Sequence, residues 1–357
     1  MTPVLDVPFL PEEGYVEFLQ SCREDISCIQ FSLMTGRQLD SRIHVQSLDY
    51  NERTLELMAA LKGMRKYALL NSRFYGQALF TDRESLRSVI DALEMYADQK
   101  VIDGIIYCDH YLLQLLSDEA PELAGALEAV PGINTMLDSF SKIEAQLGYI
   151  AETRFLSPGK IVLDRSLNRD LDLLAETSLK CRASFPNLKL ELLANEGCLP
   201  RCPFKLSHDA YIALGNHEGR DCTFLLNKRL GCMRLVDSRP HRILQSPFIR
   251  PEDIDLYLFH VDTIKLCGRT LGREFLQRVI TAYRTRRYQG NLLDLLDALQ
   301  WLAPSLYVDN ALLSFDFAEM LSMCDLRCAS CGFCEELFAS ITHRLPVIIR
   351  DNRVTVD

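Results

Sequence analysis

Short apolar segments alternate with longer amphipathic stretches along most of this 357-residue chain, and this alternation constrains the fold more than any other feature. Eight segments of four to seven residues are rich in aliphatic and aromatic side chains and are bounded by polar or turn residues, as strands are. The segments that we predict as strands are Cys28–Leu33, Tyr67–Asn71, Ile102–Cys108, Ile133–Asp138, Ile161–Asp164, Leu188–Ala194, Pro247–Arg250 and Thr263–Cys267.

The stretches between these segments carry apolar residues at helical spacing, such as Leu86, Val89, Ile90 and Leu93. Eight strands that alternate with helices predict an α/β fold, a (β/α)8 TIM-like barrel. An open doubly wound sheet is the alternative, but no G-x-G-x-x-G turn follows a predicted strand to support a dinucleotide site.

Two regions interrupt the alternation and set the predicted domain organisation. We assign residues 1–290 to the barrel. Within this range, residues 195–245 form a long cysteine-containing insertion, which we expect to be functional because long loops in compact barrels usually are. Residues 291–357 form a cysteine-rich C-terminal extension that we expect to dock on the barrel.

Composition favours a soluble cytoplasmic protein with reduced cysteines. The chain carries a net charge of −10, so a nucleic-acid partner is not indicated. It has no apolar run long enough to span a membrane, and its first residues lack the basic and apolar regions of a signal peptide. Thirteen cysteines in a reducing compartment are better explained as metal ligands and buried thiols than as disulfides.

Four of these cysteines, Cys324, Cys328, Cys331 and Cys334, lie within eleven residues in the run Cys-Asp-Leu-Arg-Cys-Ala-Ser-Cys-Gly-Phe-Cys. Thiols this close cannot all pair as unstrained disulfides, but they can surround one metal centre. Their spacing is close to a ferredoxin-type run read backwards, which favours a [4Fe-4S] cluster. Zinc is the alternative, although four-thiolate zinc sites usually join two C-x2-C pairs across a longer loop.

The first three of these cysteines also match the C-x3-C-x2-C pattern of radical S-adenosylmethionine enzymes. In those enzymes the motif follows the first barrel strand, whereas here the run lies near the end of the chain. A fourth cysteine would also occupy the iron position that S-adenosylmethionine needs. We therefore reject this reading.

A second group of cysteines is predicted at the barrel mouth. Cys198 and Cys202 follow the predicted sixth strand, and nearby prolines stiffen their loop, which suits a preformed metal site. Cys232 in the insertion and Cys267 at the end of the last predicted strand complete a candidate cofactor-binding set. Cys222 or Cys28 could replace one of them.

Polar residues after the predicted strands supply the candidate catalytic groups, because barrel active sites lie at the C-terminal ends of the strands. Lys265, Cys267 and Arg269 alternate along the last predicted strand and its end, so their side chains should point to the same face of the strand. There Lys265 and Arg269 could bind an anionic group. Glu196 follows the sixth strand, and His208 in the insertion could donate protons or ligate metal. Each of these could equally be a structural residue.

The later part of the chain resembles the collagenase-like "U" peptidase family. The resemblance lies in Ser246-Pro-Phe-Ile-Arg-Pro-Glu-Asp-Ile, in Thr263-Ile-Lys-Leu-Cys-Gly-Arg-Thr, in Tyr283 and in Tyr288-Gln-Gly-Asn. Family members have a Ser-Lys-Asp-Leu segment, a Lys-Ile-Glu-Gly-Arg strand and a tyrosine-containing helix. Lys265 and Arg269 match the family's Lys and Arg, whereas Cys267 stands where the family has Glu.

This resemblance implies a barrel core with cysteines after the sixth strand. Despite the peptidase label, the family includes oxygen-independent hydroxylation proteins that hold a [4Fe-4S] cluster on four cysteines. The chain is thus expected to be an iron–sulfur redox enzyme with two clusters that receives electrons from a donor such as a ferredoxin. The alternative is a non-catalytic iron–sulfur or zinc-binding partner subunit of a related barrel protein; the substrate does not carry over.

Overall fold

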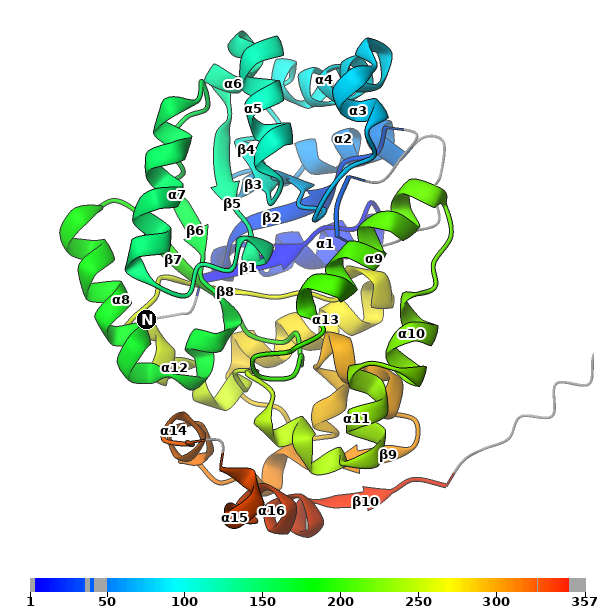
Figure 1. The fold of residues 1–357 in the computed structure, drawn as a ribbon, viewed down its shortest axis with the longest axis vertical. Coiled ribbons are helices and arrows are strands. Elements are labelled where there is room, and N and C mark those ends of the chain that lie inside the picture. Colours follow the sequence, from blue (N-terminus) through cyan, green and yellow to red (C-terminus); the bar gives the residue numbers. More distant parts are fainter. Residues whose placement is uncertain (1–3, 36–38, 42–49, 326, 347–357) are drawn as a thin grey trace, which may run out of the picture.

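Eight parallel strands form one curved sheet with helices around it in a computed structural model that describes residues 4–35, 39–41, 50–325 and 327–346 (Figure 1). The strand order is β5-β4-β3-β2-β1-β8-β7-β6, and parallel bridges Glu128↔Leu156 and Leu137↔Leu163 link the two edges. The strands are β1 Val4–Pro8, β2 Ile26–Ser32, β3 Arg65–Leu70, β4 Gly104–Tyr107, β5 Glu128–Pro131, β6 Lys160–Val162, β7 Lys189–Leu193 and β8 Thr263–Lys265. The sheet is therefore a nearly closed barrel.

Helices between the strands complete the (β/α)8 barrel, and the predicted fold class is confirmed. Each packs an apolar face on the sheet; on α4, for example, Leu86, Val89, Ile90 and Leu93 are buried. The barrel helices are α1 Glu13–Ser21, α2 Tyr50–Ala59, α3 Ala78–Thr81, α4 Arg83–Asp98, α5 His110–Glu119, α6 Pro121–Ala126, α7 Phe140–Glu152, α8 Leu171–Ser184, α12 Ile254–Leu258 and α13 Gly272–Thr285. No helix in the described part of the chain is long and apolar enough to cross a bilayer.

Two of the eight predicted strands were wrong, and two observed strands, β1 and β5, were not predicted, so the total of eight is unchanged. The first strand, β1, begins at Val4, in a segment that the sequence analysis did not assign. Ile133–Thr135 is a 3-10 turn after β5 rather than a strand, and Pro247–Arg250 is an irregular segment. The long insertion therefore follows β7, the seventh strand, and continues to β8.

The insertion and the C-terminal extension share a hydrophobic core of their own. Leu199, Ile243 and Phe248 of the insertion pack with Leu293, Phe317 and other apolar residues of the extension. The insertion contains α9 Lys205–Glu218, α10 Thr223–Arg229, α11 Cys232–Ser238 and the 3-10 helix η4 Pro240–Gln245, and the 3-10 helix η5 Pro251–Asp253 follows it. In Figure 1 these helices run down one side of the barrel toward the orange and red extension. The extension thus rests largely on the insertion.

The extension itself is built from short elements and begins with two 3-10 helices. The elements are η7 Leu292–Asp294, η8 Asp297–Leu302, β9 Leu306–Val308, η9 Asn310–Leu312, α14 Phe317–Ser322, α15 Cys328–Cys331, α16 Phe333–Ile341 and β10 Thr342–Arg344. Strands β9 and β10 pair antiparallel. Residues 347–357 of the predicted extension lie outside the described residues.

Candidate functional site

The barrel mouth is a small cavity of about 90 Å³ that brings together six of the eight site residues predicted for the barrel. They come from the loops after β7 and β8 and from α9. The six are Glu196, Cys198, His208, Lys265, Cys267 and Arg269. The wall also contains Asn71, Asn134, Lys205 and Asp209, which the sequence analysis did not assign to the site. The volume admits a small chemical group and a few waters.

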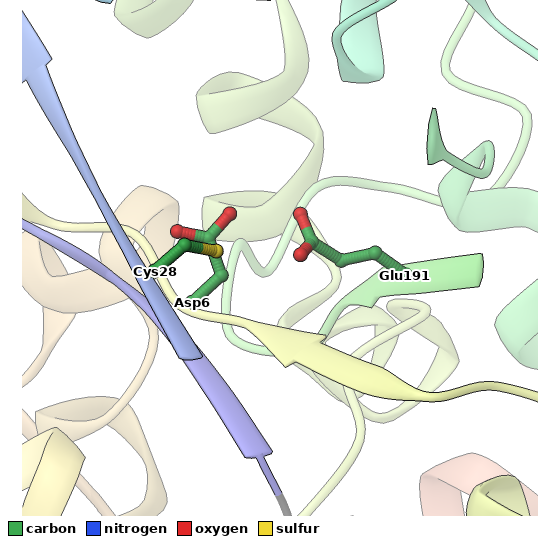
Figure 2. Close-up of side chains that lie close together, drawn as sticks. All are labelled: Asp6, Cys28 and Glu191. Carbon is green, nitrogen blue, oxygen red and sulfur yellow. The ribbon is translucent and has the colours of Figure 1, made fainter. Parts of the chain in front are cut away.

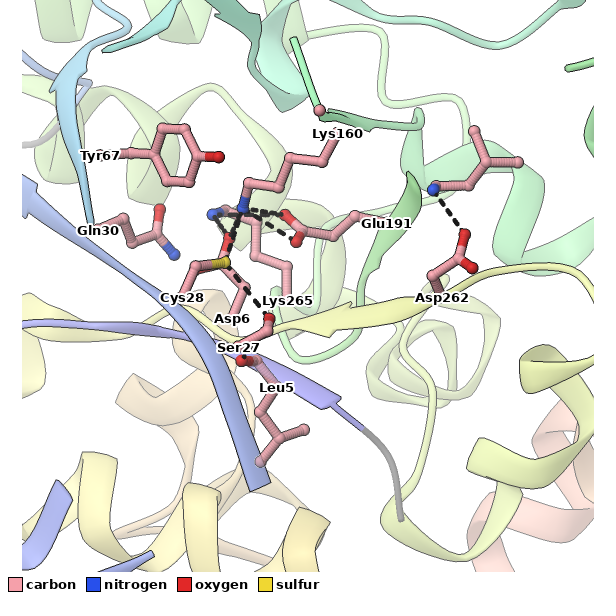
Figure 3. Close-up of polar contacts among 12 residues, drawn as sticks. Leu5, Asp6, Ser27, Cys28, Gln30, Tyr67, Lys160, Glu191, Asp262 and Lys265 are labelled. Atoms are coloured by element: carbon pink, nitrogen blue, oxygen red, sulfur yellow. Dashed lines mark hydrogen bonds and ion pairs between the residues drawn. The ribbon is translucent and has the colours of Figure 1, made fainter. Parts of the chain in front are cut away.

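Below the mouth, Lys265 joins a buried charge network inside the barrel (Figure 3). The Lys265 Nζ donates to Asp6 Oδ2 at 2.7 Å, and the Lys160 Nζ donates to the same oxygen at 2.6 Å. Lys160 also reaches Glu191 Oε2 at 3.1 Å. Both carboxylates are fully buried, so each ammonium offsets a charge that would otherwise be costly inside the barrel.

Asp6, Cys28 and Glu191 also form a potential metal-ligand set, because their ligand atoms lie within 4.8 Å of one another (Figure 2). The Lys160 Nζ, however, lies 2.6 Å from Asp6 Oδ2, 3.0 Å from Cys28 Sγ and 3.1 Å from Glu191 Oε2. This ammonium occupies the position that a metal ion would need. Cys28 lies in the middle of β2 rather than at its end, and burial and Asp6 raise the pKa of its thiol to about 12.

The two buried carboxyl groups have different protonation behaviour. Burial opposes ionisation of Asp6, but Lys160 and Lys265 outweigh it and hold the Asp6 pKa well below its usual value. Burial and the neighbouring Asp6 charge raise the pKa of Glu191 to about 7, despite the two lysines. Near neutral pH, Glu191 is therefore the carboxyl group of this network that takes up or releases a proton.

Cations around the mouth are paired with carboxylates. Arg269 lies 2.7 Å from a carboxylate oxygen of the fully buried Asp40, and Arg165 forms an ion pair with Glu196. Asp209 accepts from both Arg73 and Lys205. Lys265 and Arg269 do share one cavity with Cys267, but each already has a protein carboxylate as a partner. That they bind an anionic group of a substrate stays a prediction.

The four cysteines predicted to hold a barrel cofactor are only partly brought together. Cys198 and Cys202 interact electrostatically, and Cys202 interacts in turn with Cys232. Burial raises the pKa of all three thiols. Cys267 shares the mouth cavity with Cys198, whereas Cys202 and Cys232 pack against the core between insertion and extension. Cys222 is exposed at the start of α10.

The four C-terminal cysteines line one cavity of about 420 Å³ at the surface of the extension. Cys324, Cys328 and Cys331 are exposed, and Cys334 is half-buried. Burial and the three other thiols together raise the pKa of Cys334 to about 11, so all four lie close enough to interact. Gln245 of the insertion donates its Nε2 to Cys328 Sγ at 3.4 Å. A donor set of four adjacent thiols suits a soft metal or an iron–sulfur cluster.

Of this buried network only Lys265 was predicted, because Asp6, Lys160 and Glu191 do not lie at the C-terminal ends of predicted strands. Glu191 lies inside the strand Lys-Leu-Glu-Leu-Leu, with apolar neighbours on both sides. Lys160 begins β6, and Asp6 lies in β1, which was not predicted. A charged residue that interrupts an apolar strand was the available signal, since barrel strands alternate between the interior and the helix layer.

Fold and site together define a (β/α)8 barrel with a surface four-cysteine loop in a C-terminal extension. No known family profile matches the chain. An uncharacterized protease, MJ1657, of Methanocaldococcus jannaschii is 35% identical over 181 residues, which cover 50% of this chain and 51% of that protein. The chain spans about half the length of this curated relative. This similarity to a protein named as a protease agrees with the resemblance of the later part of the chain to the collagenase-like "U" peptidase family.

Solved structures were compared as well. The U32 peptidase Mk0906 is 14% identical, with a TM-score of 0.49 over 74% of this chain and 93% of that chain. A putative α-L-fucosidase from Bacteroides thetaiotaomicron is 13% identical, with a TM-score of 0.36 over 62% of this chain and 84% of that chain. These values are too low to carry an argument about function.

Proposed function

We propose that the chain is an iron–sulfur redox enzyme of the oxygen-independent hydroxylase type. The observation that carries the proposal is the single cavity lined by Cys324, Cys328, Cys331 and Cys334. Four thiols of one short loop face the same space and interact with one another, which is the donor set that a [4Fe-4S] cluster uses. Such a cluster, when bound, exchanges single electrons with a donor such as a ferredoxin.

The barrel mouth is the proposed place where substrate reacts. Lys265 and Arg269 would orient a polar group of the substrate through hydrogen bonds, while their ion pairs with Asp6 and Asp40 keep both side chains fixed. His208 lines the same space and would supply or accept a proton. Cys198, Cys202, Cys232 and Cys267 are the proposed ligands of a second cluster beside this cavity.

Two other functions compete with this one. The relative's name suggests peptidase activity, which is one alternative. A non-catalytic partner subunit, or a zinc protein, would use the same C-terminal thiols without a reaction in the barrel.

Metal analysis after anaerobic purification tests the proposal. We expect about eight irons and matching acid-labile sulfide per chain, corresponding to two clusters. Cys328→Ser with Cys331→Ser should remove about half of the iron. Cys222→Ser, which changes an exposed thiol that lines neither cavity, is the matched control and should keep all of it; loss of iron in this variant would instead make Cys222 a ligand of the barrel cluster. Zinc without sulfide would contradict the proposal.

A further inference from the structure

A cavity of about 680 Å³ lies between the barrel and the extension, several times the volume of the barrel mouth. Its barrel side is formed by η3 (Arg165–Arg169) and the first turn of α8, and its other side by Leu321 to Cys324 at the end of α14. Volumes of about 300 to 1,000 Å³ are typical of small-molecule sites. This space is therefore large enough for a whole metabolite, which the mouth is not.

The side chain of Arg169 is a fixed cation in the wall of this cavity. Its Nε donates to the Ser246 carbonyl oxygen at 3.1 Å, and its Nη2 bonds the same oxygen. The guanidinium lies 5.1 Å from the ring centre of Phe248 and 5.8 Å from that of Phe317. Hydrogen bonds and aromatic rings thus fix its orientation and leave further N–H groups for a ligand.

The half-buried Arg169 differs from Lys265 and Arg250 because no carboxylate of the described residues forms an ion pair with it. Lys265 is paired with Asp6, and Arg250 with Asp253. Burial lowers the pKa of Arg169 and outweighs the opposing effects of Tyr257 and Asp253. An arginine that is held rigid but not neutralised is suited to binding an oxyanion.

A second arginine lines the same cavity at its exposed rim. Arg201 has a φ of 47°, a left-handed conformation that is uncommon for a residue other than glycine. The carboxylates of the wall are partly engaged elsewhere: Asp138 pairs with Lys142 at 2.8 Å, and Asp170 caps α8 through the Leu173 N–H at 3.0 Å. Asp172, on the first turn of α8, is exposed. The positive charge of Arg169, inside the cavity, is thus only partly neutralised by the carboxylates of the wall.

We propose that this cavity binds a small molecule that bears a carboxylate or phosphate group, with Arg169 as the anchor and Arg201 at the entrance. The site goes beyond the proposed function, because its anchor lies on the barrel side and needs no cluster. Gln245, Met323 and Cys324 line both this cavity and the four-cysteine cavity. A bound molecule would therefore lie against the cysteine loop.

Calorimetric titration of the full-length protein with inorganic phosphate and with malonate, at constant ionic strength, tests the site. We expect Arg169→Gln to weaken binding roughly 10- to 100-fold, because one charge-assisted hydrogen-bonding group is lost. Arg201→Gln should weaken it a few-fold. Arg182→Gln, an exposed arginine of α8 paired with Asp262, is the matched control and should bind as the unmodified protein does. Binding of only one probe would identify the oxyanion class.

Equal binding by the unmodified protein and Arg169→Gln would overturn the proposal, as would binding to neither probe. Loss of binding in Arg269→Gln but not in Arg169→Gln would place the anion in the mouth instead. Arg169→Lys, which keeps the charge and a donor for Ser246, should retain intermediate affinity and guards against a folding defect. Binding should persist in Cys328→Ser with Cys331→Ser; its loss there would contradict a barrel-side anchor, whatever the iron content.

Discussion

The barrel interior and the C-terminal cysteine loop hold their reactive groups in opposite ways. Inside the barrel, Asp6, Lys160 and Lys265 are buried, and both lysines donate hydrogen bonds to Asp6. In the loop, three of the four thiols face solvent, and Cys328 receives one long hydrogen bond from Gln245. The interior charges stabilise each other without a ligand, whereas the loop places donors that a metal centre would bring together. The first region should therefore govern stability, and the second should respond to metal.

The strongest challenge to this comparison is to remove one interior charge. Lys160→Met keeps roughly the same volume but leaves Asp6 and Glu191 with Lys265 as their remaining cation. Breaking a buried ion pair from one side typically costs about 3–5 kcal/mol. We expect a loss of this size in the free energy of unfolding, measured by urea denaturation followed by circular dichroism.

Lys142→Met is the matched control, because Lys142 forms an exposed ion pair with Asp138. Exposed pairs contribute about 1 kcal/mol or less. If both variants lost a similar amount of unfolding free energy, the buried ion pairs would stabilise the protein no more than an exposed pair does, and the comparison would fail.

The interior should also give the protein a specific pH dependence. Glu191 has a pKa raised from 4.5 to about 7, so the folded state holds this proton more tightly than the unfolded state. Its contribution to stability is complete below pH 4.5 and is lost as the pH rises toward 7, on the order of 2–3 kcal/mol. Asp6, with a lowered pKa, changes its contribution only at more acidic pH.

Glu191→Gln should therefore remove the decline in stability between about pH 4.5 and pH 7, because glutamine mimics the protonated acid. Unfolding midpoints across this range measure it. Glu176→Gln, which alters an exposed pair with Lys180, should leave the decline unchanged. A variant at residue 191 that kept the full decline would assign it to another group.

The cysteine loop could be predicted from the sequence, whereas most of the network in the barrel interior could not. Periodicity predicted the (β/α)8 barrel because apolar strands and amphipathic helices repeat with recognisable spacing. The cysteine loop was visible because all four residues are close in sequence. The interior network was not, since Asp6, Lys160 and Glu191 come from three strands far apart in the chain.

Local competition explains the misplaced elements. Pro247–Arg250 has the composition of a short strand, but Arg250 is used to bind Asp253 and the carbonyl groups of Leu313 and Ser314. This tertiary role keeps the segment outside the sheet. Similarly, the predicted strand Ile133–Asp138 begins with a 3-10 turn after β5, and this turn places Asn134 at the mouth.

Arg250 also connects the segment before η5 to the extension, because it donates to the carbonyl groups of Leu313 and Ser314. Its replacement should therefore loosen the extension from the barrel. Arg250→Lys keeps the charge but loses the two-pronged contact with Asp253 and at least one carbonyl contact. We expect a loss of about 1–2 kcal/mol in the free energy of unfolding. Relative to the unmodified protein, amide hydrogen exchange should become faster in residues 292–322 and should change little in β1 to β8. Uniform acceleration across the barrel would show that the extension is not a separately opening unit.

The smallest effect is expected at the cysteine loop itself. In metal-free protein, Cys328→Ser with Cys331→Ser should change the free energy of unfolding by less than about 0.5 kcal/mol, because both side chains are exposed. In metal-loaded protein the same change should lower the thermal midpoint, since a ligand that binds only the folded state stabilises it. Cys222→Ser, also exposed, should have no effect in either form. A midpoint shift in the metal-free protein would mean that the loop thiols already stabilise the extension by packing, and the contrast between a self-sufficient interior and a metal-dependent loop would fail.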